Sequence, residues 1–223
     1  MDVVEAIRTR KSIRGFTNQP VPREILEEIL EISTRAPSSD NSQPWEIYIL
    51  AGEALDNIRK ENLEALEEQM RSSQGGGSSG GYAPVYRERQ IKLAVQLYQL
   101  MDIGREDREK RFAWMERGYR FFDAPVGLIL TADESLDNQT AASDNGGLAQ
   151  TICTVAVKYG LGTCIIQQGI TYPEVIRRNA GIPDSKKLHL GIALGYPDWE
   201  FPANKIESDR EPLDVVTTWK GFD

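Results

Sequence analysis

Cysteine and histidine are scarce in this chain of 223 residues, which contains two cysteines and one histidine. Two cysteines cannot build a disulfide scaffold or a cysteine metal cage. Cys153 and Cys164 both lie in apolar runs, so we expect buried thiols. His189 alternates with leucines in a strand-like run, and we expect it to be structural. The sequence therefore predicts no metal site.

Long hydrophobic runs and an excess of basic residues are also missing. No apolar run is long enough to span a bilayer, and we expect neither a signal peptide nor a membrane partner. The formal net charge of −8 argues against nucleic acid as a partner. The expected location is the cytoplasm. Because 40% of the residues are hydrophobic, the chain can bury a substantial core.

Hydrophobic periodicity and turn residues predict both helices and strands. A short helix follows Asp2, and further helices are expected over residues 23–35, 53–71, 87–101, 106–120 and 140–159 and after Pro173. Strands are expected at 46–50, 126–132, 163–166 and 188–194, and 215–219 could form one more. We therefore predict an α+β (α/β-type) fold, with a mixed central sheet wrapped by helices, in one domain over residues 1–223.

Residues 72–86 interrupt this pattern with a stretch rich in glycine and serine. Residues 72–81 cannot bury enough apolar area to offset the entropy of ordering them, so we expect a flexible excursion. Tyr82 and Tyr86 follow at once. The excursion is either a substrate lid or a tolerated insertion.

A basic cluster stands out against the acidic composition. Arg8, Arg10, Lys11 and Arg14 crowd together after the first helix, with the hydroxyl of Ser12 among them. Like charges this close repel each other, so one interpretation is that an anion such as a phosphate neutralises them. The alternative is a solvated basic turn.

Three further motifs accompany this cluster. Residues 37–45 read Pro-Ser-Ser-Asp-Asn-Ser-Gln-Pro-Trp, residues 160–164 read Gly-Leu-Gly-Thr-Cys, and residues 210–213 read Arg-Glu-Pro-Leu. Taken alone, the first could be a loop of Asx- and ST-turns. Together and in this order, the four motifs resemble the FMN-dependent nitroreductase family over nearly the whole chain. Residues 191–197 and 212–214 are similar to the nitrobenzoate reductase-like branch.

The resemblance implies an interlocked homodimer with two FMN sites, each taking residues from both subunits. It assigns the phosphate to Arg10, Ser12 and Arg210, and the N1–O2 edge of the flavin ring to Arg14 with help from Lys11. Across the dimer it assigns the pyrimidine edge or the ribityl hydroxyls to the loop containing Pro37, Ser38, Ser39 and Asn41. A backbone N–H near Gln168 or Gly169 would meet the flavin N5.

The same resemblance implies an NAD(P)H oxidoreductase that reduces nitroaromatic compounds, quinones or similar flat acceptors. No G-x-G-x-x-G motif follows a strand, so NADH or NADPH and the acceptor would use the flavin in turn, by ping-pong hydride transfer. Tyr82, Tyr86 and Trp114 are candidates to contact the small aromatic acceptor, and Tyr119, Phe121 and Phe122 could also cover the flavin face. The alternative is that these aromatic residues belong to the core. The alternatives are reductive dehalogenation, enone reduction or flavin fragmentation on the same scaffold, and a non-catalytic FMN-binding protein.

Overall fold

A four-stranded sheet forms the centre of the molecule, for which a computed structural model describes residues 1–72 and 83–222. Its strands are β1 (Trp45–Ala51), β2 (Val126–Asp133), β3 (Gly162–Ile166) and β4 (Lys186–Gly195), in the order β1-β2-β4-β3. All three pairings are antiparallel. The α+β class is confirmed. The sequence also predicted a mixed sheet, but in the described residues the parallel pairing is one isolated bridge between Ser12 and Thr163.

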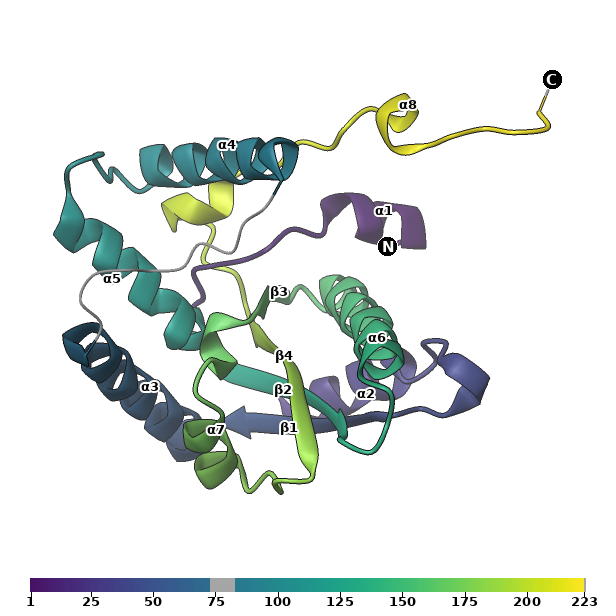
Figure 1. Cartoon of the computed structure of the whole chain (residues 1–223), viewed down its shortest axis with the longest axis horizontal. Coiled ribbons are helices and arrows are strands. Elements are labelled where there is room, and N and C mark those ends of the chain that lie inside the picture. The colour runs from purple at the N-terminus through teal and green to yellow at the C-terminus, as the bar shows by residue number, and fades with distance from the viewer. Residues whose placement is uncertain (73–82, 223) are drawn as a thin grey trace.

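Helices cover both faces of this sheet (Figure 1). One face packs against α2 (Arg23–Ser33) and α6 (Asn138–Lys158), and its core includes Leu128, Leu148 and Ile192, each at most 1% exposed. The other face packs against α3 (Gly52–Ser72), α7 (Pro173–Ala180) and the short turn η2 (Phe121–Asp123). Pro173 begins α7, and Gly181 ends it with a positive φ of 65°, as the sequence predicted.

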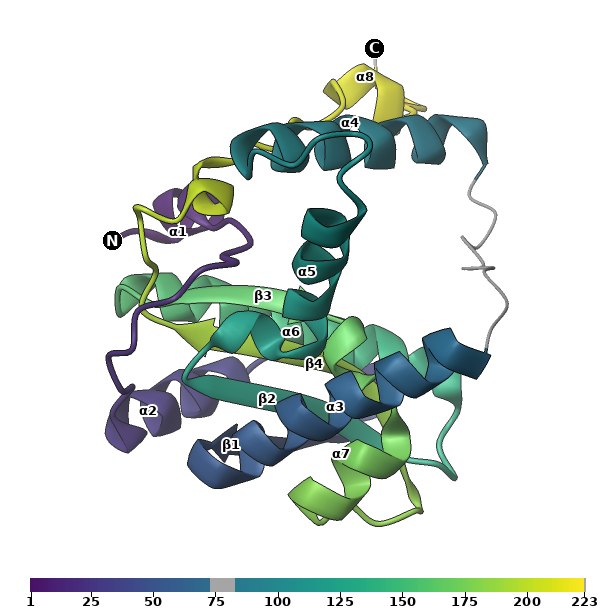
Figure 2. The same cartoon turned by 90° about the vertical axis from the view of Figure 1, so that its left-hand side faces the viewer.

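A further layer stands above the sheet (Figure 2). It contains α4 (Pro84–Leu100), and α5 (Arg108–Tyr119) descends from there toward the sheet. The layer also holds α1 (Val3–Thr9) and the C-terminal tail, which we define as residues 206–222 and which includes α8 (Leu213–Val216). The turn η4 (Pro202–Lys205) packs under α4 just before the tail begins. This layer carries the basic cluster predicted to bind phosphate.

The strand predicted at residues 215–219 is wrong, because residues 213–216 form α8 and no strand of the described residues pairs with this segment. Branched residues favour strands, but a strand needs a partner for its backbone groups. A helical turn satisfies some of these groups locally, as the bond from Val215 N–H to the Pro212 carbonyl shows at 3.1 Å.

The predicted excursion is described only at its ends. Ser72 is the last residue of α3, and Pro84 begins α4, so both ends are helical. Residues 73–82, including Tyr82, lie outside the described residues, and the flexibility expected of them stays a prediction.

Cys153 and Cys164 are buried at 2% and 4% exposure and unpaired, as predicted, and burial raises the pKa of Cys153 to about 11. Over the described ranges, no helix is long and apolar enough to cross a membrane, and no group of three metal-ligating side chains is present. The cytoplasmic location stays a prediction.

Candidate functional site

The basic residues lie on an N-terminal segment, residues 10–15, that follows the outer edge of β3. Ile13 N–H donates to the Thr163 carbonyl at 2.9 Å, and the Ile13 side chain is 2% exposed. This anchor leaves Arg10, Lys11 and Arg14 half-buried above the edge of the sheet. An apolar anchor in the middle of the segment therefore fixes where its cations lie.

Asn204 of η4 clamps the end of this segment. Its Oδ1 accepts from the N–H groups of Arg14, at 2.7 Å, and of Gly15, at 3.2 Å. Its Nδ2 donates to the carbonyls of Gly15, at 2.7 Å, and Asp198, at 2.8 Å. The Asn204 side chain is buried, and its two bonds to Gly15 are buried with it. The position of Arg14 is thus set by a residue 190 positions further along the chain.

Arg117 of α5 holds the same segment from the other side. Its Nη2 donates to the Arg14 carbonyl at 3.0 Å, and its Nη1 lies 3.2 Å from a carboxylate oxygen of Asp123. The guanidinium also lies over the ring of Phe201, 4.6 Å from its centroid. Burial lowers the pKa of Arg117, with Asp123 opposing that shift. The segment is therefore held between α5 and η4.

A cavity of about 560 Å³ brings the basic cluster together with the C-terminal tail. Its walls include Arg8, Arg10 and Lys11 at the end of α1, and Ser208 and Arg210 of the tail. We call it the basic cavity. The structure thus places four of the predicted cations in one space, although Arg10 and Arg210 lie 200 positions apart in the sequence.

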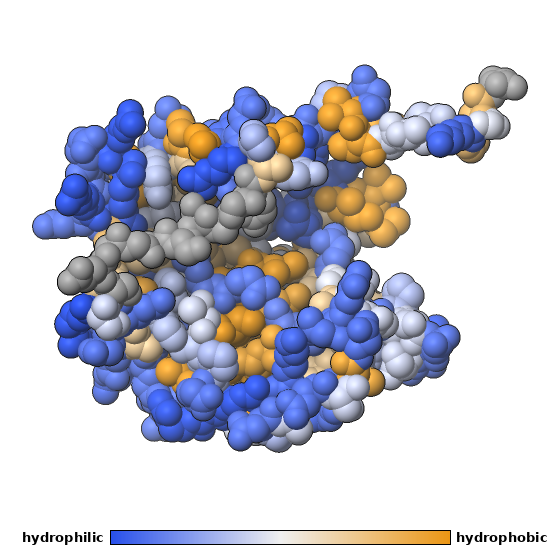
Figure 3. Space-filling model, in the orientation of Figure 1, coloured by the Kyte–Doolittle hydropathy of each residue, from blue (hydrophilic) through white to orange (hydrophobic). Residues whose placement is uncertain are grey.

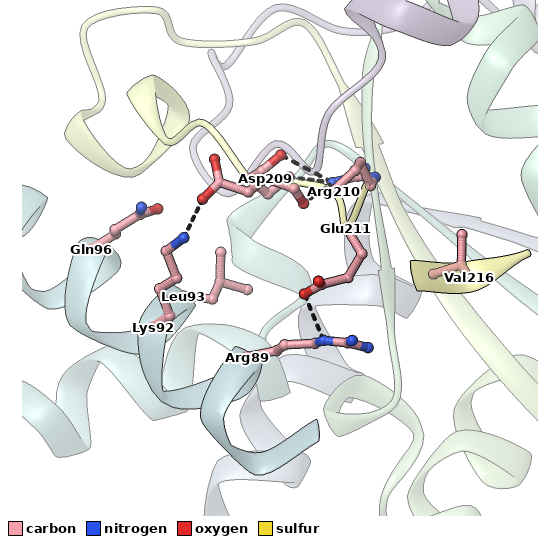
Figure 4. Close-up of a pocket in the computed structure, with 9 residues that line it drawn as sticks. Arg89, Lys92, Leu93, Gln96, Asp209, Arg210, Glu211 and Val216 are labelled. Atoms are coloured by element: carbon pink, nitrogen blue, oxygen red, sulfur yellow. Dashed lines mark hydrogen bonds and ion pairs between the residues drawn. The ribbon is translucent and has the colours of Figure 1, made fainter. Parts of the chain in front are cut away.

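Two ion pairs connect the tail to α4 on either side of Arg210 (Figure 4). Lys92 Nζ lies 2.5 Å from an Asp209 oxygen, and Arg89 Nε lies 2.8 Å from a Glu211 oxygen. The pairing raises the pKa of Lys92 and lowers that of Asp209. Arg210, between Asp209 and Glu211, lines the cavity beside α4 as well as the basic cavity. We call this arrangement the tail clasp.

The loop of residues 37–45 is built with an unusual backbone. Asp40, Asn41 and Gln43 have positive φ values of 51°, 56° and 46°. The Ser38 hydroxyl accepts from Gln43 N–H at 3.0 Å, and Ser39 N–H donates to Asp144 at the start of α6, at 3.2 Å. Non-glycine residues in this conformation cost energy and concentrate at functional sites. No bond within the described residues uses the side chains of Ser39 or Asn41.

This loop and the N-terminal segment are not brought together within one chain. The loop bonds to Asp144 near the start of α6, whereas Arg10 and Lys11 share a cavity with Val157 near its end. At a rise of about 1.5 Å per residue, these two points of the helix are roughly 20 Å apart. A single chain therefore separates two groups of residues that the sequence assigned to one site.

Gln168 and Gly169 form the turn η3 (Gln168–Ile170) directly after β3. Their backbone N–H groups have no acceptor in the described part of the chain, as expected for the first residues of a helical turn. Asn62 of α3, which is fully buried, fixes the turn by donating to the Gly169 carbonyl at 2.9 Å. A side chain at Gly169 would approach the ring of Phe121 within 2.6 Å, so glycine is required there. The turn offers two fixed, unused donors.

The aromatic residues predicted to contact the acceptor lie in different parts of the structure. Trp114 packs with Phe201 and Leu97 and lines a small cavity with Arg117 and Arg120, away from η3. Tyr86 is 53% exposed at the start of α4, and Phe121 and Phe122 are core residues. No described cavity joins Tyr86 or Trp114 to the basic cavity, so their role as substrate contacts stays a prediction.

These features fit a phosphate-bearing flavin. The basic cavity offers arginine and lysine donors to a phosphate, and η3 offers unused N–H groups to a ring acceptor. Arg10, Lys11 and Arg210 line the basic cavity, whereas Ser12 and Arg14 lie beside it on the N-terminal segment, so the assignment of these five residues to the cofactor stays a prediction. Asn204, Arg117 and Asn62 were missed from the sequence, because each acts through distant backbone groups and none lies in a recognisable motif.

Comparison with known proteins agrees with this geometry. A sequence model of the nitroreductase family matches residues 7–196. The chain is 34% identical to a chloronitrobenzene nitroreductase of Comamonas testosteroni over 223 residues, which covers 96% of this chain and 95% of the relative. It is 32% identical to a 4-nitrobenzoate reductase of Nocardioides sp., covering 96% and 87% of the two chains. The crystal structure of an FMN- and NADPH-dependent nitroreductase from Sphigopyxis sp. strain HMH superposes with a TM-score of 0.92 at 30% identity, covering 100% of both chains.

Proposed function

The chain belongs to the nitroreductase family, and on that premise we propose that it is an FMN-dependent NAD(P)H oxidoreductase whose acceptors are nitroaromatic compounds. The observation that carries the proposal in this chain is the basic cavity, where Arg10 and Lys11 meet Arg210. Arginine suits a phosphate because its planar fork donates to two oxygens at once.

The chain's own residues bind and orient the cofactor. Arg10, Ser12 and Arg210 hold the phosphate, and Lys11 adds charge beside them. Arg14, fixed by Asn204 and Arg117, supplies a positive charge to the N1–O2 edge of the ring, which favours the reduced cofactor. The N–H groups of Gln168 and Gly169 orient the N5 edge. When bound, FMN supplies the two-electron carrier, and NAD(P)H and the acceptor use the site in turn.

The site is completed in a homodimer. Exposed small or polar residues follow one side of α6, namely Ser143, Gly146, Gly147 and Gln150. If two copies of α6 pack antiparallel across a twofold axis, the start of one helix lies beside the end of the other. The partner's loop of residues 37–45 then reaches the N-terminal segment, and Ser38, Ser39 and Asn41 face the flavin.

The exposed apolar surface supports the same assembly. Apolar residues gather over α1 and α8 (Figure 3), including Val3, Ile7, Leu213 and Val216, each more than half exposed. Exposed apolar patches mark interaction surfaces. A second copy of the chain would cover them and give the tail a surface to pack on.

An anaerobic assay tests the proposal. The purified FMN-loaded protein should lose its yellow colour when NADH or NADPH is added, and 4-nitrobenzoate or nitrobenzene should restore it. Arg210→Ala should weaken FMN binding by about 1.5–3 kcal/mol, as for other hydrogen bonds to charged groups. Arg23→Ala is the matched control, because Arg23 lies on α2, lines neither the basic cavity nor the tail clasp, and pairs with Glu27 of the same helix. An FMN affinity unchanged in Arg210→Ala would contradict the phosphate site.

A further inference from the structure

A second cavity, of about 1270 Å³, lies between α4, α5 and η3. Its walls come from α4, from Ile103 and Arg105 between α4 and α5, from Arg111 and Met115 of α5 and from Gln168 of η3. This volume is large for a small-molecule site, so it has room for an extended ligand. We call it the α4–α5 groove, and it is separate from the basic cavity, with which it shares no lining residue.

The charged residues that line this groove are all positively charged. Arg87, Arg105 and Arg111 line it, and its walls contain no aspartate or glutamate. None of the three arginines pairs with a carboxylate among the described residues, although the chain has 34 acidic residues and a net charge of −8. Elsewhere on the same two helices, Arg89 and Arg117 each have a carboxylate partner. The groove therefore concentrates uncompensated positive charge.

The three guanidinium groups remain available to a ligand. Arg111 donates through Nε to the Gly104 carbonyl at 3.2 Å and lies over the Tyr98 ring, 4.9 Å from its centroid, which leaves its two terminal nitrogens unused. Arg87 makes one contact, to the Gln90 side chain at 3.3 Å. Arg105 makes no hydrogen bond or ion pair in the described part of the chain. Guanidinium groups in a one-sign cleft attract and bind phosphate oxygens.

The opposite end of the groove reaches the residue expected beside the flavin. Gln168 lines the groove, and its Nε2 lies 3.5 Å from the Met115 carbonyl, a long contact. Met115 lies one helical turn below Arg111, which is about 6 Å along α5. In Figure 2, α5 descends from α4 toward the sheet. Residues of both helices line the groove together with Gln168 of η3, so the groove joins the arginines to this turn. An elongated anion can therefore place its charged end beside the three arginines and a ring beside Gln168.

We propose that the α4–α5 groove binds the diphosphate of NAD(P)H, with Arg87, Arg105 and Arg111 as its specificity-determining residues. The inference rests on the proposed function, because a nicotinamide dinucleotide combines a diphosphate with a flat reactive ring. The diphosphate lies at the arginines, and the nicotinamide lies at Gln168. Nitroaromatic acceptors without phosphate use the ring end of the groove and make no contact with the arginines.

A hydride donor without phosphates separates this proposal from the proposed function. 1-Benzyl-1,4-dihydronicotinamide carries the same reactive ring as NAD(P)H but no diphosphate. Stopped-flow reduction of the FMN-loaded protein is measured with NADPH, NADH and this donor, for the wild type and for Arg87→Ala, Arg105→Ala, Arg111→Ala and the triple variant. Arg108→Ala is the matched control, because Arg108 begins α5 but does not line the groove.

The triple variant should raise the KM for NADPH and NADH roughly ten- to hundredfold. Its reduction by the benzyl donor, its FMN content and its KM for 4-nitrobenzoate should match the wild type, and Arg108→Ala should change none of these. An unchanged KM for NAD(P)H, or an equal loss with the benzyl donor, would overturn the groove assignment. A wild-type protein reduced by the benzyl donor but by neither NADH nor NADPH would instead overturn the proposed function.

Discussion

Single buried side chains fix the position of the candidate site, and Asn204 is the clearest example. Its amide bonds two N–H groups and two carbonyls of residues 14–15 and 198, and it reinforces the backbone bond from Asp198 N–H to the Gly15 carbonyl, which measures 3.1 Å. Removing such a group leaves buried backbone donors and acceptors without partners, which costs about 1–3 kcal/mol or more.

Asn204→Ala should therefore lower the free energy of unfolding by roughly 3 kcal/mol and weaken FMN binding, because Arg14 is no longer held. Urea denaturation and FMN fluorescence titration measure the two effects. Asn204→Asp is the informative companion, since it keeps the acceptor for Arg14 but sets a carboxylate against the Gly15 and Asp198 carbonyls. A stable Asn204→Ala protein with normal FMN affinity would show that the clamp has no role in the site.

Asp133, the last residue of β2, should make the stability of the fold depend on pH. Two bonds from Ser135, at 2.6 Å and 3.0 Å, and then Lys186, at 3.1 Å, lower the pKa of Asp133 to about 2 from an ordinary value of 3.8. A lowered pKa in the folded state means that the ionised group stabilises the fold above pH 3.8, and that this contribution is lost as the pH falls through 2.

Asp133→Asn should accordingly have a lower Tm than the wild type at neutral pH. The difference should shrink steadily between pH 4 and pH 2, as the wild-type carboxylate becomes protonated. Thermal melts followed by circular dichroism across this range measure it. A difference in Tm that is the same at pH 7 and pH 2 would assign the effect to shape and hydrogen bonding instead of charge.

At the scale of elements, the tail clasp links α4 to the phosphate end of the site. Exposed ion pairs of this kind contribute little to stability, typically about 0–1 kcal/mol each. Their effect should therefore appear in where Arg210 points and not in whether the protein folds.

Lys92→Glu should weaken FMN binding several-fold by repelling Asp209 and releasing the tail. The exchange Lys92→Glu with Asp209→Lys should restore the wild-type affinity, because the pair is re-formed with reversed charges. Added salt should reduce the difference between single variant and wild type. Equal FMN affinities in the wild type and both variants would show that the tail clasp does not orient Arg210, and that its own bonds to Ser208 and Asp209 do so.

The sequence predicts elements well where local chemistry decides them. The stripe containing Leu26 and Ile29 identifies α2, and both residues are buried. The apolar residues of α1 show the limit of this approach. Val3 and Ile7 share a helical face with Ala6, yet only Ala6 is buried, while the other two are 68% and 55% exposed. Periodicity identifies an apolar face but does not say which chain covers it.

The same limit applies to the site. The residues proposed to bind phosphate stand out in the sequence because four cations lie close together in an acidic chain and Arg210 lies in a recognisable motif. Three other features could not be predicted from the sequence, because each depends on contacts between distant segments. They are the clamp by Asn204, the contact of Arg117 with the Arg14 carbonyl and the bond from Asn62 to η3. The unpaired arginines of the α4–α5 groove lie in two helices and in the turn between them, where charged residues are common.

At the scale of the whole molecule, each active site of the proposed homodimer needs two chains. Arg14→Ala alters the N-terminal segment, and Asn41→Asp alters the loop that the partner would contribute. Each variant alone should be nearly inactive, because both sites of its dimer carry the same defect.

After subunit exchange between equal amounts of the two variants, heterodimers should regain one intact site. With random pairing, the mixture should recover roughly a quarter of the wild-type sites, and nitroreductase activity should rise to match. Native mass spectrometry of differently tagged variants confirms the exchange. Confirmed heterodimers without recovered activity would show that segment and loop serve separate sites.

The bond between Arg14 and Asn204 also has a consequence for the order of events during synthesis. The N-terminal segment leaves the ribosome first, but the residue that fixes it is 190 positions later. At about 5–20 residues per second, the basic residues wait roughly 10–40 seconds before Asn204 and Arg210 are made. A nascent or truncated chain can thus fold much of its sheet while the phosphate site is still open, so capture of the cofactor belongs to the last step of the protein's maturation.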